Sequence, residues 1–457
     1  MTRSNVLGTQ DIKKLFVKLA IPAVVAQVVN MLYNMVDRMY IGHIKDIGPI
    51  ALTGVGVSMP IIMLISAFAM LIGAGGAPRA SIALGAGRKD EAEKTMATAL
   101  TAAIVLGIGL TVLFYTLAEP LLLLVGASQQ SLPYALEYTR YYVLGTLAVM
   151  FSLGMNNFIS AQGFASVAMK TTIIGAVLNI VLDPIFIFVF DLGVAGAAIA
   201  SVISQLVSAF WVFFFLRGNK THIRLRPENM GLKPAYLLPI IALGMSPFIM
   251  NSTESLLQIT YNRSLYVYGG DLYVGTMAIN ALVMQMVIIP VAGIAQGTTS
   301  IISYNYGARN ADRVEQTVKL LIKVGLTITV VAGLLVQLIP HVFASFFTKD
   351  PELMAATIRT MRIYCAGIFL LGLQITCQQS FIAFGQAKIS MFLALLRKII
   401  LLIPLILILP RLFSPQVYAV YWAEPVADII AALVSTFAFF RFLKKELALM
   451  RGETPAV

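Results

Sequence analysis

The sequence contains little charge and few of the side chains from which soluble active sites are built. Only 12% of its 457 residues are charged, about half of the roughly 25% found in soluble domains. Two cysteines, Cys365 and Cys377, and three histidines provide neither a disulfide framework nor a zinc site. Hydrophobic residues instead make up 59% of the chain. This composition excludes a soluble domain and indicates a polytopic membrane protein.

Several catalytic motifs are also missing. No GxxxxGK[ST] loop is present, which excludes ATP hydrolysis by this chain as a driving force, and neither HExxH nor GxSxG occurs. The glycine-rich stretch 72–78 is not followed by lysine, so we interpret it as a surface for close helix packing. The polar stretch 1–16 lacks the features of a cleaved signal peptide. We therefore expect no enzyme, no cofactor and no structural metal.

Charges, glycines and prolines divide the apolar sequence into segments long enough to cross a bilayer, which requires about 20 residues each. We predict twelve membrane helices, at 19–40, 50–77, 95–118, 138–160, 170–190, 194–216, 236–265, 274–303, 318–347, 359–384, 389–409 and 416–441.

The basic residues are distributed unevenly over the predicted loops. If the N-terminus is cytoplasmic, 25 of the 33 Lys and Arg fall on the cytoplasmic side. Because basic residues accumulate in cytoplasmic loops, we predict that both termini lie inside the cell. The same bias explains the net charge of +12 without a nucleic-acid partner.

The two halves of the sequence resemble each other. The loop 84–95 aligns without gaps on 306–317, an offset of 222, with five identical residues, and Pro22 matches Pro247 at an offset of 225. An even number of helices per repeat gives both copies the same orientation, related by an axis along the membrane normal. We predict an N-lobe at 1–216, a cytoplasmic linker at 217–235 and a C-lobe at 236–457.

One predicted helix in each half carries a polar stripe with helical spacing. In lipid such a stripe must face protein or a water-filled cavity, so we expect a cavity lined by both halves, or else hydrogen bonds between helices. The stripe residues are Gln27, Asn30, Asn34 and Asp37 in the first helix, and Asn251, Glu254, Gln258 and Tyr261 in the seventh.

The stretch 178–201 carries the strongest functional signal. Asn179 and Asp183 are four residues apart, so they share one face of a membrane helix. A carboxylate near the bilayer centre costs at least about 2.5 to 3.5 kcal/mol, which makes a functional role its default interpretation. Pro184 leaves the carbonyl of Ile180 without its helical partner. These oxygens suit a small cation or a proton, although a purely structural polar network is an alternative.

Further buried charges lie in the second half. Glu424 and Asp428 are four residues apart in the twelfth predicted helix. Arg397 and Lys398 lie near the expected cytoplasmic start of the eleventh predicted helix, whereas Glu424 lies nearer the outer end of the twelfth. This difference in depth argues against pairing with these acids, and the partners of Arg397 and Lys398 stay open.

Several of these stretches together resemble a known family. They are YNMVDRMYIG at 33–42, LGAGRKDEA at 84–92, AQGFASVAMK at 161–170 and LNIVLDPIFIFVFDLGVAGAAIAS at 178–201. Over about 12–445 the chain resembles the multidrug and toxic compound extrusion (MATE) family. The LNIxLDP and FDLGVxGAA motifs are similar to those of its prokaryotic DinF-like branch, which includes MepA-type drug exporters.

This resemblance implies an all-α integral membrane protein with two six-helix bundles arranged as a V. It implies export of amphipathic organic cations in antiport with Na+ or H+. Matched position by position, the branch's cation site falls on Asp37, Asn179, Asp183 and Ser201, where Ser201 replaces a threonine. Tyr33 and Asn34 would support this site. Glu254 is seven residues after Pro247 rather than the eight of other branches, which puts a coupling role for it in doubt.

The expected mechanism follows from burial of the two carboxyl groups, which favours their protonated form. We expect ion or proton occupancy of Asp37 and Asp183 to reshape the N-lobe cavity and release drug. The alternatives are a flippase for lipid-linked precursors and an intramembrane enzyme acting on lipid. We expect a monomer in the cell membrane, with contacts to lipid and small-molecule cations. Substrate range and the choice between Na+ and H+ stay open.

Overall fold

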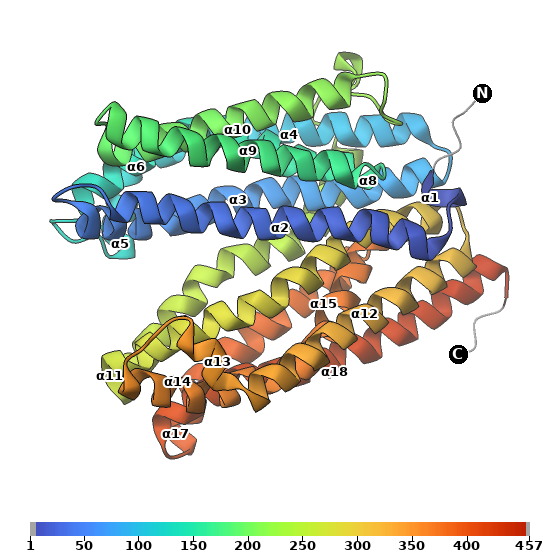
Figure 1. Cartoon of the computed structure of the whole chain (residues 1–457). Helices are drawn as coiled ribbons and strands as arrows, with labels where there is room; N and C mark the ends of the chain where they lie inside the picture. The colour runs from blue at the N-terminus through green and yellow to red at the C-terminus, as the bar shows by residue number, and fades with distance from the viewer. Residues whose placement is uncertain (1–5, 454–457) are drawn as a thin grey trace.

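The structure is a computed structural model that describes residues 6–453, and within that range it consists of helices and loops without a strand. The helices form two bundles that meet near one end of the molecule and diverge toward the other (Figure 1). The first bundle, the N-lobe, contains α1 to α10, and the second, the C-lobe, contains α11 to α18 (Figure 1). This arrangement agrees with the predicted all-α membrane protein built from two bundles.

The N-lobe elements follow one another with short connections. They are α1 (Val6–Thr9), α2 (Ile12–Gly42), α3 (Gly48–Gly85), α4 (Lys89–Thr116), α5 (Ala118–Val125), α6 (Leu132–Leu144), α7 (Thr146–Val149), a π-helical turn (Met150–Met155), α8 (Asn156–Ala161), α9 (Ala165–Pro184), a second π-helical turn (Ile185–Val189) and α10 (Gly193–Arg217).

The C-lobe begins after a linker that contains a short 3-10 helix (Pro227–Asn229). Its elements are α11 (Pro234–Gly307), α12 (Ala311–Leu338), α13 (Pro340–Ser345), α14 (Pro351–Tyr364), a 3-10 turn (Cys365–Gly367), α15 (Ile368–Ala383), α16 (Ala387–Leu395), a π-helical stretch (Leu396–Leu402), α17 (Ile403–Leu412) and α18 (Gln416–Arg451). The predicted linker 217–235 thus lies between α10 and α11, while the division into domains at these boundaries stays a prediction.

The predicted spans are found, but the helices are longer than the apolar segments. Ten helices of the described chain are long and apolar enough to cross a membrane, or eleven if the bent pair α6 and α7–α8 is one span. The helix α11 contains two of the predicted spans, which accounts for the twelfth. Gly270 divides it at a φ of 71°, a conformation that glycine adopts without strain. Polar residues extend several helices beyond the membrane, which hydropathy alone does not detect.

The two lobes are joined by backbone contacts at glycines. A methyl group on Gly85 would lie 1.9 Å from the carbonyl oxygen of Tyr304, and one on Gly307 would lie 2.0 Å from that of Ile82. These two contacts are equivalent at the offset of 222 seen in the sequence, which is what a twofold axis between the repeats requires. Only glycine permits such close backbone approach.

We call the end with these glycine contacts the terminal end, because both ends of the described chain lie there (Figure 1). The guanidinium of Arg313 donates a hydrogen bond to the carbonyl oxygen of Leu7, and that of Arg451 pairs with Asp312. The opposite end, which carries α5, α13 and α17, is called the distal end (Figure 1). The lobes therefore touch at the terminal end and separate toward the distal end.

The predicted packing role of the glycine-rich stretch is confirmed. A methyl group on Gly75 would lie 2.1 Å from the carbonyl oxygen of Ile240 in the other lobe, and one on Gly73 would lie 2.4 Å from that of Gly154. The helix α3 thus uses its glycines to pack against both α11 and the turn after α7. It lies at the centre of the contact between the lobes.

Candidate functional site

Three helices of the N-lobe bring the predicted coupling residues together. Asp37 comes from α2, Asn179 and Asp183 come from α9, and Ser201 comes from α10. The amide of Asn179 donates to Asp183 Oδ1 at 3.0 Å and to Ser201 Oγ at 3.2 Å. The carboxyl groups of Asp37 and Asp183 are close enough for their charges to interact. We call these four residues the N-lobe acid site.

The N-lobe acid site is buried and contains oxygens without partners. Asp37 is 6% exposed and Asp183 is fully buried. Asp37 Oδ1, Asp183 Oδ2 and Asn179 Oδ1 have no hydrogen-bond partner among the described residues. None of the ion pairs in that range involves either aspartate, and the neighbouring Arg38 contacts Met59 instead. Two adjacent buried carboxyl groups therefore lack a compensating cation from the protein.

Local sequence explains how these helices approach. The predicted helix at 170–190 is divided at Pro184, where α9 ends, and it continues as a π-helical turn at Ile185–Val189. A methyl group on Gly196 would lie 2.6 Å from the carbonyl oxygen of Phe186 in that turn. The absence of a side chain at Gly196 allows α10 to pack closely there. Ser201 follows on the same helix and reaches Asn179.

The polar stripe of α2 divides into separate environments. Gln27 donates from its amide to Gln296 Oε1 of the C-lobe at 2.9 Å. Asn30 and Asn34 are exposed, and Asn34 donates to the carbonyl oxygen of Asn30 at 2.6 Å. Tyr33 is half-buried one turn before Asp37. Of this stripe, only Asp37 therefore belongs to the N-lobe acid site. Gln27 instead forms a hydrogen bond between the two lobes.

A second buried cluster lies in the C-lobe. Arg397 donates to Asp428 Oδ1 at 2.7 Å and to Glu424 Oε1 at 3.1 Å, and the hydroxyl of Tyr261 donates to Glu424 Oε2 at 2.8 Å. Lys398 pairs with Glu254 at 2.5 Å and donates to the carbonyl oxygen of Met250 at 2.6 Å. We call Arg397, Lys398, Glu254, Glu424 and Asp428 the C-lobe charge cluster.

The expectation that Arg397 lies at a different depth from Glu424 and Asp428 of α18 is wrong, because Arg397 bonds to both. Arg397 lies about 15 Å along the helix that begins at Ala387, and Asp428 lies about 18 Å along α18, given a rise of about 1.5 Å per residue. The two helices run in opposite directions. In a hydrocarbon layer about 30 Å thick, both residues therefore lie near mid-depth.

The seventh-helix stripe is likewise divided. Glu254 and Tyr261 belong to or contact the C-lobe charge cluster, whereas Asn251 and Gln258 are exposed. The amide of Asn251 donates to the carbonyl oxygen of Pro247 at 2.8 Å. The pairing of Glu254 with Lys398 was not expected from the sequence. The sequence did contain a signal for this pairing: two basic residues lie in one predicted span, and three acidic residues lie in other spans of the same half.

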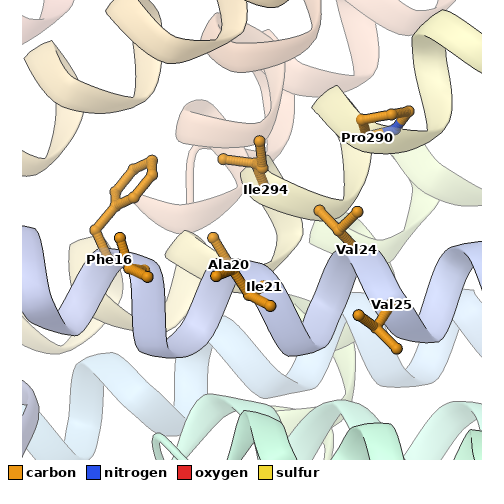
Figure 2. Close-up of a pocket in the computed structure, with 8 residues that line it drawn as sticks. Phe16, Ala20, Ile21, Val24, Val25, Pro290 and Ile294 are labelled. Carbon is orange, nitrogen blue, oxygen red and sulfur yellow. The ribbon is translucent and has the colours of Figure 1, made fainter.

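A cavity of about 300 Å³ lies where α2 crosses α11 (Figure 2). Its labelled walls are Phe16, Ala20, Ile21, Val24 and Val25 of α2, and Pro290 and Ile294 of α11 (Figure 2). Every lining residue is apolar. The cavity has no polar group that could orient a charged ligand. Its apolar walls suit a hydrocarbon chain.

The donor set of the N-lobe acid site determines what it can bind. Its ligands are carboxylate, amide and hydroxyl oxygens, which suit a proton or a small hard cation such as Na+. Within residues 6–453 no group of three or more His, Cys, Asp or Glu side chains could hold a metal ion. An ion at this site would therefore depend on Asp37, Asp183 and the neutral oxygens of Asn179 and Ser201.

Comparisons with known proteins agree with this fold. The MatE family model matches the chain twice, at residues 22–185 and 247–408. Multidrug export protein MepA of Staphylococcus haemolyticus is 23% identical over 431 residues, 94% of each chain. The corresponding protein of Staphylococcus aureus strain N315 is 24% identical over 428 residues, 92% of each. A crystal structure described as MATE in the bent conformation superposes with a TM-score of 0.92 at 24% identity, covering 99% of this chain and all of that one.

Proposed function

Because the chain belongs to the MATE family, we propose that it is a secondary active transporter that exports amphipathic organic cations in exchange for Na+ or H+. The relatives named as multidrug export proteins support the export of drugs. The membrane-spanning helices support passage across a bilayer. The choice of ion and the chemistry of the cargo are our inference.

The observation that carries this proposal is the N-lobe acid site. Buried charge is normally paired, because an isolated ionised carboxylate loses its hydration without compensation. Asp37 and Asp183 face each other with unpartnered oxygens and without a basic partner in the described chain. Such a pair is stable only with a proton or cation between the groups. Binding and release of that ion would connect the site to an ion gradient.

The helix α2 could transmit this event to the other lobe. It carries Asp37 at the acid site, and about 15 Å away along the helix it carries Gln27, which bonds to Gln296 of the C-lobe. A methyl group on Gly293 of the C-lobe would lie 2.9 Å from Val24 Cα. A change in the position of α2 at Asp37 would thus alter the contact between the lobes. Alternating access requires such a link between ion occupancy and lobe arrangement.

We place the terminal end in the cytoplasm and the protein in the cell membrane as a monomer. The bias of Lys and Arg toward that end supports this orientation. Arg397 and Lys398 were counted among the 25 basic residues on the cytoplasmic side, but they lie at mid-depth in the C-lobe. Without these two, 23 of the 33 Lys and Arg remain on that side, so the bias persists.

The flippase alternative is less favoured. Lipid-linked diphosphates would require a cationic central cavity, whereas Arg397 and Lys398 are already neutralised by three carboxylates. The named relatives are drug exporters, not flippases.

The test is uptake of ethidium into everted vesicles under separately imposed Na+ and H+ gradients. We compare wild type with Asp183→Asn, which removes one member of the acid pair. Asp191→Asn is the matched control: it makes the same chemical change at an exposed aspartate eight residues further along the chain.

We expect gradient-driven uptake in wild type and Asp191→Asn and its loss in Asp183→Asn. The gradient that drives uptake identifies the coupling ion. Full uptake by Asp183→Asn would refute the role of the acid site. Failure of every cationic substrate under both gradients would refute drug antiport, and lipid-linked substrates would be tested next.

A further inference from the structure

A polar pocket connects the two lobes at the terminal end. Its volume is about 230 Å³, and its walls come from α3, the start of α4, the start of α11 and the end of α15. Arg79, Arg88 and Glu91 belong to the N-lobe side, and Tyr236, Phe384 and Gly385 belong to the C-lobe side. We call this the inter-lobe pocket. Any occupant would contact both lobes at once.

The guanidinium of Arg79 makes no hydrogen bond or close ion pair in this pocket, although the charge of Glu91 acts on it. The three acids at the start of α4 form ion pairs with other cations: Glu91 with Arg88 at 2.6 Å, Asp90 with Lys94 at 2.5 Å, and Glu93 with Arg226 at 3.1 Å. Among the described residues, no hydrogen bond or ion pair involves Arg79. Arg79 is half-buried, and its five N–H donors make no hydrogen bond in the described structure, because Glu91, the acid that acts on it, is ion-paired with Arg88.

The internal repeat provides a control for this observation. At the offset of 222, the pocket residues Ile82 and Glu91 correspond to Tyr304 and Arg313. In the C-lobe, that equivalent place is occupied by protein: Arg313 donates to the carbonyl oxygens of Leu7 and Gln10 at 3.0 and 2.7 Å. The inter-lobe pocket is therefore the open counterpart of a filled one.

The filled counterpart is plugged by the first residues of the described chain. Leu7 is fully buried and belongs to an apolar cluster with Ile301 and Ala165. A methyl group on Gly163, the equivalent of Gly385, would lie 3.2 Å from the Leu7 side chain. In the other repeat, Leu232 stands at the position equivalent to Leu7 at the offset of 225, but it is 47% exposed. The inter-lobe pocket has no such plug.

We propose that the inter-lobe pocket binds an anionic phosphate group through Arg79, and that this group holds the lobes together at the terminal end. A guanidinium pairs with phosphate through two parallel hydrogen bonds, and the N–H donors of Arg79 are available for them. Arg88 lines the same pocket and is ion-paired with Glu91, which offsets the negative charge of that carboxylate. The hydroxyl of Tyr236, on the C-lobe wall, offers a donor from the other side. The apolar wall at Ile82 and Phe384 suits the first carbons attached to a phosphodiester.

Position supports a phosphate from the membrane surface or from solution. Arg79 lies six residues before the end of α3, about 9 Å along the helix, which is headgroup depth for a helix that projects from the bilayer. A phospholipid headgroup and free phosphate share the chemistry that Arg79 recognises. Because the group would touch both lobes, it would favour the arrangement in which the terminal end is closed. The inference does not depend on which solute is transported.

The experiment measures binding to the full chain in nanodiscs rather than transport. One arm uses nanodiscs of phosphatidylcholine with about 30% phosphatidylglycerol. Native mass spectrometry then counts the phosphatidylglycerol molecules that stay bound to each protein. The other arm uses phosphatidylcholine alone and titrates inorganic phosphate by calorimetry. The variants are Arg79→Gln and, as the matched control, Lys89→Gln, which removes a charge from the exposed first residue of α4. Arg79→Lys keeps the charge but loses the paired geometry, and it serves if Arg79→Gln does not fold.

We expect Arg79→Gln to weaken binding by on the order of tenfold to a hundredfold, the range for charge-assisted hydrogen bonds, while Lys89→Gln stays within about twofold. Arg79→Lys should fall between them. Retention of phosphatidylglycerol alone identifies a lipid site, and a phosphate titration alone identifies a soluble ligand. Equal binding by wild type and both Arg79 variants in the two arms would overturn the proposal.

The closing effect has its own measurement. Nitroxide labels at Glu119→Cys and Lys349→Cys lie on exposed positions of the two lobes toward the distal end. The native cysteines Cys365 and Cys377 are buried and should not be labelled. The bound phosphate group should shift the distance distribution toward the longer separation, and Arg79→Gln should abolish this shift. An unchanged distribution on binding would refute the link to lobe arrangement.

Discussion

The two lobes both bury acids near the middle of the membrane, but they balance the charge differently. In the C-lobe, Arg397 lies between Glu424 and Asp428, and Lys398 pairs with Glu254. In the N-lobe, Asp37 and Asp183 have no basic partner among the described residues. The C-lobe therefore contains its own counter-ions, whereas the N-lobe needs a proton or cation from outside.

This difference separates two roles for the same type of residue. Breaking a buried ion pair leaves an uncompensated charge and costs about 3 to 5 kcal/mol, so removing one member of the C-lobe charge cluster should destabilise the fold. Removing one carboxyl group from the N-lobe acid site instead relieves repulsion between like charges. We therefore expect mutations in the first cluster to affect folding and mutations in the second to affect transport.

The largest expected effect is on stability, from Arg397→Met. This change leaves two buried carboxylates facing Tyr261 without their cation, and we expect destabilisation by about 3 to 5 kcal/mol. Thermal unfolding of the purified protein in detergent measures it. Adding Glu424→Gln and Asp428→Asn to the variant should restore most of the loss. A single Arg397→Met variant as stable as Asp183→Asn would remove the distinction between the lobes.

A smaller effect is expected from Glu254→Gln. Its side chain is 42% exposed, so solvent screens its attraction to Lys398, and Lys398 keeps its bond to the carbonyl oxygen of Met250. We expect a loss of about 1 kcal/mol or less in the same unfolding assay. Lys398→Met should cost more, because it removes both bonds. The reverse order would show that Glu254, not Lys398, is the residue on which this contact depends.

The smallest effect is expected from Ser201→Ala in the N-lobe. Ser201 Oγ accepts one bond from the Asn179 amide, which also donates to Asp183. Loss of one neutral hydrogen bond corresponds to about 0.5 to 1.5 kcal/mol, so the concentration of coupling ion giving half-maximal uptake should rise about twofold to tenfold. The maximal rate should stay near wild type. A change in maximal rate without a change in ion dependence would exclude Ser201 as part of the ion site.

Much of the fold could be predicted because hydropathy and internal similarity depend on local sequence. The two bundles, the glycine packing of α3 and the grouping of Asn179 with Asp183 all follow from spacing along one segment. The pairing of Arg397 with Asp428 could not be predicted, because depth was judged from apolar boundaries and not from where the helices begin. A pocket between α3, α11 and α15 leaves no pattern in any single segment.

The division of the α2 stripe also required the structure. Helical spacing places Gln27 and Asp37 on related faces, but it does not say which helix each face meets. In the structure Gln27 meets α11, while Asp37 meets α9. The stripe was predicted to line one water-filled surface, but its two ends contact different helices.

The reciprocal contacts of Gly85 and Gly307 also bear on how the chain can change over generations. After a duplication, two copies can diverge wherever each serves only its own lobe, and the two loops here differ in their charges. At the axis, however, each glycine touches the backbone of the other copy. A larger residue in either copy would push the lobes apart for both, and no side-chain change in the partner could make room. Both positions are thus constrained to glycine by the same contact, although they lie 222 positions apart in the sequence.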